Sequence, residues 1–291
     1  MEPGRPVQQR RGGDPPEGSG AGSGAPPAAL TGQARSVGVR LEAAGRRLDV
    51  VLAAPDRRNS QTPATWRALA AVGDWAADVA DVVVIRSEGP SFSAGLDRRA
   101  FTAEGLPDEP GLRQLAALAP AELDATIAAF QAGFTAWSRG PFVSIAAVQG
   151  HAVGAGFQLA LACDVRIAAT DASFAMREAA LGLVPDLGGT GPLVDAVGYA
   201  RAVEICATAR WVHAAEAERI GLVQAVVPPQ ELAGAVDRLV DAVLANPAGA
   251  VQATRALLSG ARRRDPREQL AAERSAQGDR LRDLLREGPA G

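Results

Sequence analysis

The longest apolar stretch of the chain, residues 142–163, does most to limit the folds open to it. It approaches the length of a membrane-spanning helix, but polar and glycine residues interrupt it. The interrupting residues are Gln149, Gly150, His151, Gly154, Gly156 and Gln158. The pattern therefore predicts a buried strand over 143–148, a glycine-rich turn, and a buried helix over 155–163.

The same succession of strand and helix occurs elsewhere along the chain. Residues 37–41 and 47–52 predict a hairpin, and Thr62-Pro63 provides the cap and first residue of an amphipathic helix. Residues 81–85 form a β-branched run suited to a strand buried on both faces, and 165–169 predict another strand. Alternating strands and helices are typical of an α/β core.

The two ends differ from this core. Residues 1–34 are dominated by Gly, Pro, Ser and Ala, which predicts a disordered tail. After Pro228-Pro229, residues 231–245 and 267–286 have helical periodicity. We therefore expect three parts: the tail 1–34, the core 35–195 and a helical region 196–291.

Composition excludes several classes of function. The formal net charge of −3 gives no general positive field, so neither nucleic acid nor a membrane surface is an expected partner. All basic residues are arginine, which excludes lysine Schiff-base chemistry. Cys163 and Cys206 lack CxxC spacing, so we expect no metal site and a reducing, cytoplasmic location. The first residues also lack the apolar segment of an export signal.

Two glycine-containing loops are candidates for binding a negatively charged oxygen. One is Ser91–Asp97, where Gly95 lets the backbone approach a ligand, and the other precedes the helix at 155–163. Amide groups at the start of a helix have no partner within the helix, and the helix dipole favours negative charge there. A dinucleotide site needs a glycine fingerprint with an acidic ribose ligand about 20 residues on, and it is disfavoured because the spacing here does not match.

Four segments in order carry a family resemblance: FSAGLD (92–97), GHAVGAGFQLALACD (150–164), FAMREAALGLVPDLGGT (174–190) and AAEAERIGLVQAVVP (214–228). With them the chain resembles the enoyl-CoA hydratase/isomerase (crotonase) family, from about residue 37 onward. The resemblance implies a spiral of ββα units and a C-terminal helical region that builds homotrimers or hexamers (dimers of trimers). It also implies an acyl-CoA thioester as substrate, with coenzyme A as part of that substrate and no separate cofactor.

The resemblance assigns an oxyanion hole to the backbone N–H groups of Leu96 and Ala155. The adjoining Ala94, Gly95, Asp97 and Gly154 are then expected to contact the substrate. Two donors aimed at the thioester oxygen stabilise an enolate by several kcal/mol, and loss of one costs on the order of a hundredfold in rate.

Proton transfer is expected from residues of the next two segments. The family's hydratases use two glutamates, and the matching positions here are Gln158 and Glu178. Gln158 can orient a water but cannot exchange a proton, whereas Glu178 lies among apolar residues that should raise its pKa toward working pH. Asp186 is a second candidate acid, although Pro185-Asp186 before two glycines is also ordinary turn chemistry.

Further substrate contacts follow from position. Arg57 lies where the family's CoA nucleotide passes, and arginine suits phosphate, although a solvated surface role is an alternative. Phe134 and Trp137 belong to an apolar helical stripe with Ile127 and Phe130, which either packs in the core or shapes the acyl pocket with loop 98–120.

Three functions are compatible with these residues. The first is a 2-enoyl-CoA hydratase, which adds water in syn geometry while Gln158 holds the water. The second is an enoyl-CoA isomerase that moves a double bond with Glu178 alone. The third is a non-catalytic acyl-CoA-binding protein.

Overall fold

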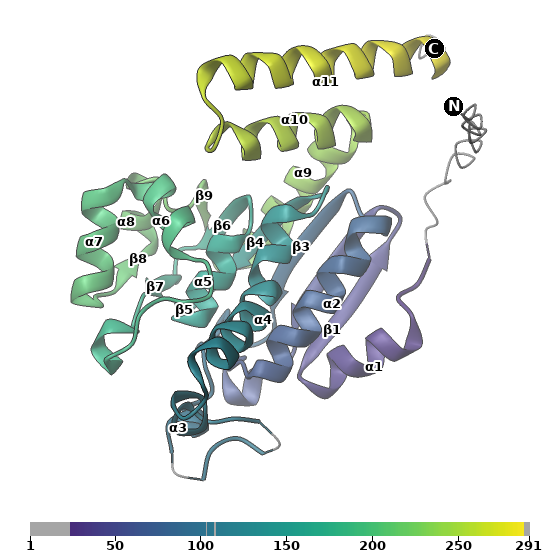
Figure 1. Cartoon of the computed structure of the whole chain (residues 1–291). Coiled ribbons are helices and arrows are strands. Elements are labelled where there is room, and N and C mark those ends of the chain that lie inside the picture. Colours follow the sequence, from purple (N-terminus) through teal and green to yellow (C-terminus); the bar gives the residue numbers. More distant parts are fainter. Residues whose placement is uncertain (1–23, 103, 108, 288–291) are drawn as a thin grey trace, which may run out of the picture.

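The computed structural model describes residues 24–102, 104–107 and 109–287 (Figure 1). Its helices are α1 Ala28–Ser36, α2 Pro63–Val79, α3 Leu112–Ala116, α4 Pro120–Arg139, α5 Ala155–Ala162, α6 Thr190–Val197, α7 Tyr199–Thr208, α8 Ala214–Arg219, α9 Leu232–Leu244, α10 Ala248–Ala261 and α11 Pro266–Glu287. Short 3-10 turns are η1 Pro55–Arg57, η2 Arg98–Phe101, η3 Ala179–Leu181 and η4 Pro229–Glu231.

The strands form a large and a small sheet. The large sheet contains β1 Val39–Ala44, β2 Arg47–Leu52, β3 Val82–Ser87, β4 Val143–Val148, β6 Val165–Ala169 and β9 Ala225–Val227, in the spatial order β1-β2-β3-β4-β6-β9. Only β1 runs antiparallel to its neighbour there. The small sheet contains β5 His151–Val153, β7 Ser173–Ala175 and β8 Val212–His213, in the order β5-β7-β8.

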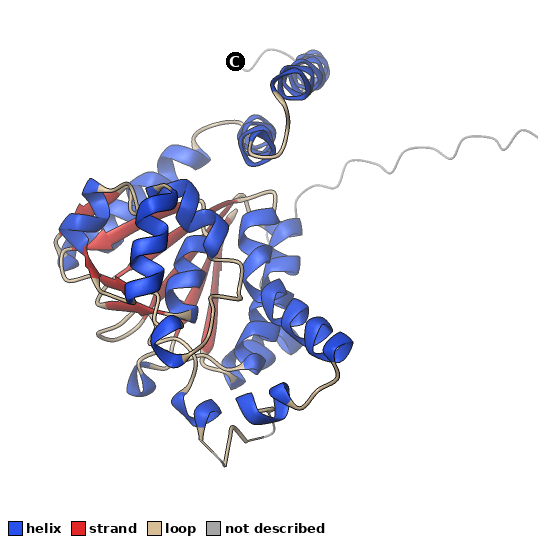
Figure 2. Cartoon of the chain, turned by 60° about the vertical axis from the view of Figure 1, so that its left-hand side comes forward, coloured by secondary structure: helices blue, strands red, loops and turns tan. Residues whose placement is uncertain are grey.

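The predicted α/β core is confirmed, and from β4 to β7 successive strands along the chain alternate between the large and the small sheet. One face of the large sheet packs against the buried sides of α2 and α4, and α9 covers part of the other face (Figure 2). The cap at Thr62 also forms as predicted, since its side chain accepts a hydrogen bond from the amide of Thr65. Gly133 allows α4 to approach α2 closely: a Cβ there would lie 2.4 Å from the carbonyl oxygen of Trp66.

The predicted extent of the disordered tail is wrong at its C-terminal side. Residues 28–36 form helix α1, in which Ala34 is fully buried and Leu30 packs against the core. These two residues are one helical turn apart and so face the same side, where α2 and β1 cover them. A segment poor in apolar residues is thus ordered by tertiary contact. The remainder of the predicted tail, 1–23, lies outside the described residues.

The predicted boundary between residues 195 and 196 is also wrong. It falls within α6, and two later strands belong to the sheets: β8 pairs with β7, and β9 pairs with β6. Short apolar strands such as β9 are hard to distinguish from helix ends by periodicity. The α/β core therefore continues to about residue 227, and the helical region begins with α9.

Helices α10 and α11 form a hairpin that stands apart from the sheets in both views (Figures 1 and 2). Arg255 of α10 attaches it to the core. Its guanidinium donates to both carboxylate oxygens of Asp164, at 2.8 and 3.0 Å, and to the carbonyl oxygen of Gly140 at 2.6 Å. It also donates to the carbonyl oxygen of Ser138 at 2.9 Å, so the last turn of α4 gains a cationic donor. No helix of the described ranges is both long and apolar enough to cross a membrane.

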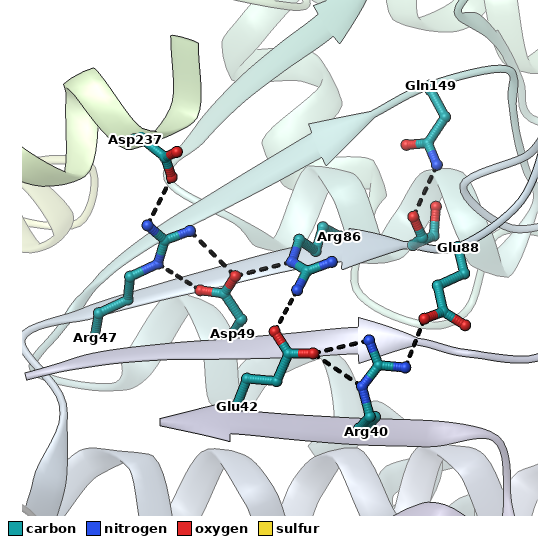
Figure 3. Close-up of polar contacts among 9 residues, drawn as sticks. Arg40, Glu42, Arg47, Asp49, Arg86, Glu88, Gln149 and Asp237 are labelled. Atoms are coloured by element: carbon teal, nitrogen blue, oxygen red, sulfur yellow. Dashed lines mark hydrogen bonds and ion pairs between the residues drawn. The ribbon is translucent and has the colours of Figure 1, made fainter. Parts of the chain in front are cut away.

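A chain of ion pairs joins β1, β2, β3 and α9 (Figure 3). Buried Asp49 accepts hydrogen bonds from Arg47 at 2.6 Å and from Arg86 at 2.8 Å. Arg86 continues the chain to Glu42, and Arg47 continues it to Asp237 of α9 at 2.7 Å. Asp49 therefore holds two arginines of neighbouring strands at once.

Replacement of Asp49 by Ala is expected to lower the free energy of unfolding by about 1–3 kcal/mol, since both arginines lose a shared, charged acceptor. Glu42→Ala is the matched control, because the Glu42 side chain is 42% exposed and that of Asp49 only 8%. An exposed pair contributes at most about 1 kcal/mol. Denaturant unfolding measures both values, and equal losses would contradict the central place given to Asp49.

Candidate active site

The two predicted glycine-containing loops lie side by side and are paired through their backbones. The amide of Phe92 donates to the carbonyl oxygen of Gln149, and that of Ser93 to His151, each at 2.9 Å. In return, the amide of Val153 donates to Ser93 at 3.0 Å. The first loop thus continues the edge of the small sheet, which fixes its position relative to the start of α5.

Gly95 brings the two predicted oxyanion donors together. Its φ of +81° is left-handed, and a Cβ there would lie 2.4 Å from the carbonyl oxygen of Val153 and 3.4 Å from the amide nitrogen of Ala155. The peptide that carries the Leu96 amide is therefore adjacent to Ala155. Among the described residues, no acceptor is bonded to either the Leu96 or the Ala155 N–H.

Helix α5 supplies the second donor from its first turn. Gly154 precedes it with φ 49° and ψ −116°, a conformation that glycine tolerates, and its own amide is held by the carbonyl oxygen of Ala175 at 2.9 Å. Ala155 is the first helical residue, so its amide has no acceptor within the helix. All eight residues of α5 are buried, which fixes this donor rigidly.

Glu178 lies beside this pair of amides. A Cβ on Gly154 would be 3.3 Å from its Oε1, and Oε1 accepts a hydrogen bond from Nε2 of Gln158 at 2.8 Å. Glu178 is only 9% exposed, and its Oε2 is buried without a partner in the described part of the chain. Burial raises the pKa of Glu178, and the nearby charge of Asp186 raises it further, while the hydrogen bond from Gln158 lowers it. The predicted rise in pKa is confirmed.

The other candidate for proton transfer, Asp186, lies in the loop before α6. Desolvation raises its pKa, although the residue is exposed. Its backbone oxygen accepts a hydrogen bond from Gln131 of α4 at 2.7 Å. The structure brings Asp186 near enough to influence Glu178, but its part in catalysis stays a prediction.

Comparison with known proteins identifies the family to which this chain and its site belong. The model of the enoyl-CoA hydratase/isomerase family matches residues 48–289. The chain belongs to this family. A solved structure of a putative enoyl-CoA hydratase from Thermobifida fusca, in complex with acetoacetyl-CoA, is 47% identical with a TM-score of 0.83. That match covers 87% of this chain and 98% of the other. The crotonase-like fold predicted from the resemblance is thereby confirmed.

Curated relatives in the family match over a shorter segment. A probable enoyl-CoA hydratase from Mycobacterium tuberculosis is 38% identical over 154 residues, which is 52% of each chain. A crotonyl-CoA hydratase from Syntrophomonas wolfei is 40% identical over 134 residues, 46% of this chain and 52% of the relative. The match thus spans about half the length of these curated relatives.

Two residues predicted to bind the substrate belong instead to the core of this family member. Phe134 and Trp137 are 1% and 0% exposed. The Phe134 ring lies 5.9 Å from that of Trp66, and the indole N–H of Trp137 donates to the carbonyl oxygen of Gly133 at 2.8 Å. Their stripe faces α2 and the sheet, so the packing alternative holds and the acyl-pocket prediction is wrong.

The remaining predicted contacts are only partly free for a ligand. Arg57 donates to the carbonyl oxygen of Val37 at 2.6 Å, which directs its guanidinium toward β1. Asp97 pairs with Arg99 at 2.9 Å, and this hydrogen bond lowers the pKa of Asp97 to about 2. Ala94 is exposed within the first loop, Ser91–Asp97. Contact of these three with the substrate stays a prediction.

Sequence reasoning missed the side chain that supports the first loop. Asn59 is buried with φ 52°, and its Nδ2 donates to the carbonyl oxygens of Glu88 and Ser91, each at 2.9 Å. Its Oδ1 accepts from the amide of Ala54 at 2.8 Å. A single asparagine after two arginines carries no distinctive pattern. Only asparagine's tolerance of left-handed backbone hints at such a role.

The buried carboxylate has a consequence for stability that is open to test. The pKa of Glu178 in the folded chain lies above the value of 4.5 expected when unfolded. Ionisation therefore costs the folded state free energy, and the penalty develops as pH rises from 4.5 through the folded pKa. Glu178→Gln is expected to raise Tm at pH 7 by roughly 2–4 °C, equivalent to about 1 kcal/mol. Thermal unfolding at several pH values checks this, and a gain that persists below pH 4.5 would contradict the assigned cause.

Proposed function

We propose that this family member is a 2-enoyl-CoA hydratase. The observation that carries the proposal is the unpaired, buried Oε2 of Glu178 beside two backbone amides, Leu96 and Ala155, that have no acceptor in the described chain. The names of the relatives support it, since those quoted above are hydratases. Coenzyme A enters as part of the substrate, as in the acetoacetyl-CoA complex of the Thermobifida fusca protein.

Hydration requires two proton transfers, and the carboxyl group of Glu178 carries out both. Glu178 takes a proton from water while the water oxygen bonds to C3, and the electrons of the double bond move onto the thioester oxygen. Leu96 and Ala155 donate to that oxygen and stabilise the enolate. The carboxylic acid then returns the proton to C2, on the same face that received the hydroxyl. Water adds in syn geometry, and Glu178 ends ionised.

A second function, enoyl-CoA isomerisation, is favoured by one observation. Of the two positions that carry glutamate in the family's hydratases, the first is occupied here by Gln158, so only one glutamate remains. One carboxylate can remove a proton from C2 of a 3-enoyl-CoA and return it to C4 of the resulting enolate, which forms the conjugated 2-enoyl-CoA and needs no water. The same amides would stabilise the intermediate.

Absorbance separates these functions. Incubation of the protein with a 2-enoyl-CoA is expected to remove the absorbance of the conjugated thioester. Incubation with a 3-enoyl-CoA under the same conditions would create that absorbance if the protein is an isomerase. Binding of a CoA ester without either change would overturn both activities and leave a non-catalytic binding protein.

We also propose that the helical hairpin assembles the chain into a homotrimer or a hexamer. Four leucines of α11 are exposed in the isolated chain, and they are Leu270, Leu281, Leu284 and Leu285. Exposed large apolar side chains that lie together on one helix favour association. Sedimentation of the parent chain and of a variant with Leu281, Leu284 and Leu285 changed to Gln tests this, and a monomeric parent would overturn it. Location in the cytoplasm and the absence of a metal or separate cofactor stay predictions.

A further inference from the structure

The side-chain amide of Gln158 can take only one orientation. Its Oε1 accepts hydrogen bonds from the backbone amides of Leu187 at 3.0 Å and Gly189 at 3.2 Å. A flipped amide would point its own N–H groups at these two donors, which would leave all of them unpaired. Gln158 is 1% exposed, so water does not offer an alternative. Its Nε2 must therefore point toward Glu178, to which it donates at 2.8 Å.

The loop that fixes Gln158 is itself held against it. A Cβ on Gly189 would lie 2.7 Å from Cγ of Gln158, so this position has no room for a side chain. The backbone oxygen of Asp186 in the same loop is bonded to Gln131. The loop thus presents its two amides to Gln158 at a fixed place.

We propose that Gln158 is a positioning residue. Its hydrogen bond to Oε1 of Glu178 leaves Oε2 as the carboxylate oxygen that accepts and returns the proton. This role rests on the proposed function of Glu178. It differs from the expectation that Gln158 holds the reacting water, because its oxygen is already bonded to two amides and one of its N–H groups to Glu178. Because Oε2 both accepts and returns the proton, both transfers take place at the same position in the site.

The electrostatics support this role. The hydrogen bond from Gln158 lowers the pKa of Glu178 against the upward effect of burial. Within the described ranges, two titratable groups interact with Glu178: Asp186 in the following loop raises its pKa, and Cys206 of α7 has its own pKa raised by burial and by the Glu178 charge. Loss of the Gln158 donor would therefore leave Glu178 protonated to higher pH.

Two substitutions of Gln158 test the proposal with a short-chain 2-enoyl-CoA as substrate. Gln158→Leu removes the donor, so the acid limb of the kcat profile is expected to move to higher pH. At its optimum, kcat should fall about tenfold, as expected for loss of one hydrogen bond. KM should stay within about twofold of the parent.

Gln158→Glu keeps an acceptor for the amides of Leu187 and Gly189. It therefore still tests the proposal if Gln158→Leu does not fold. Its second oxygen would lie where Nε2 now lies, 2.8 Å from Glu178, and two carboxylates this close must share a proton. A new alkaline limb, absent from the parent, is expected where that proton is lost. A purely structural role for Gln158 predicts neither change in the pH profile.

Glu178→Gln separates failure of this proposal from failure of the proposed function. If Glu178→Gln is inactive and both Gln158 variants keep the parent's pH profile, the positioning role is wrong while the function stands. If Glu178→Gln remains as active as the parent, both are wrong. A shifted acid limb in Gln158→Leu, or, where that variant does not fold, the alkaline limb in Gln158→Glu, supports the positioning role.

Discussion

Replacement of Glu178 by Gln is expected to reduce the hydration of a 2-enoyl-CoA by about a thousandfold, because an amide can neither accept nor return the proton. The side chain keeps its shape, and Oε1 can still accept from Nε2 of Gln158. Binding of the CoA ester should therefore be retained. Initial rates and a separate binding measurement on the same preparation distinguish lost chemistry from lost binding.

Asp186→Asn is the informative companion variant. The Asp186 charge raises the pKa of Glu178, so its removal should shift the acid limb of the rate profile to lower pH. A loss of less than about tenfold in kcat is expected if Glu178 carries both proton transfers. A loss as large as that of Glu178→Gln would instead make Asp186 a catalytic residue and contradict the one-carboxylate account.

Ala155→Pro is expected to lower kcat/KM by about a hundredfold or more, because proline has no N–H to donate to the enolate oxygen. The position suits this test, since Ala155 is the first residue of α5. Proline is tolerated there because the missing N–H makes no bond within the helix. The proline ring also occupies space at the hole, so the loss includes weaker binding.

Ala155→Gly is the matched control for the proline variant. It keeps the N–H and removes only a methyl group, so its activity should stay close to that of the parent. Circular dichroism and Tm of both variants show whether α5 is intact. A proline variant that folds and retains at least a third of the parent's kcat/KM would contradict the assignment of Ala155 to the oxyanion hole.

Strands β1, β2, β3, β4 and β6 of the large sheet were predictable because local patterns and burial agree there, whereas β9 and the small sheet were not. Residues 143–148 and 165–169 are short apolar runs bounded by turn residues, and they match β4 and β6. Leu96 and Ala155 were predictable from the family resemblance, because a backbone donor survives changes of side chain. Helix α1 was not predictable from the sequence, because contact with α2 and β1, rather than its own composition, orders it.

The details of the site depend on contacts between distant segments. Periodicity identified the stripe of Phe134 and Trp137, but a period does not say whether the stripe faces the core or a pocket. The orientation of Gln158 depends on two amides that follow it by 29 and 31 residues. No local pattern encodes such a contact, so the sequence predicted an acid/base position without its hydrogen bonds.

Formation of a thioester enolate is the central claim, and exchange of C2 hydrogen with solvent measures it most directly. A saturated acyl-CoA incubated with the protein in deuterium oxide contains no double bond, so hydration and isomerisation do not contribute. Mass spectrometry should show uptake of one deuterium per molecule with the parent, and none above background with Glu178→Gln or Ala155→Pro. Uptake by both variants at the parent's rate, or none by an otherwise active parent, would contradict the account.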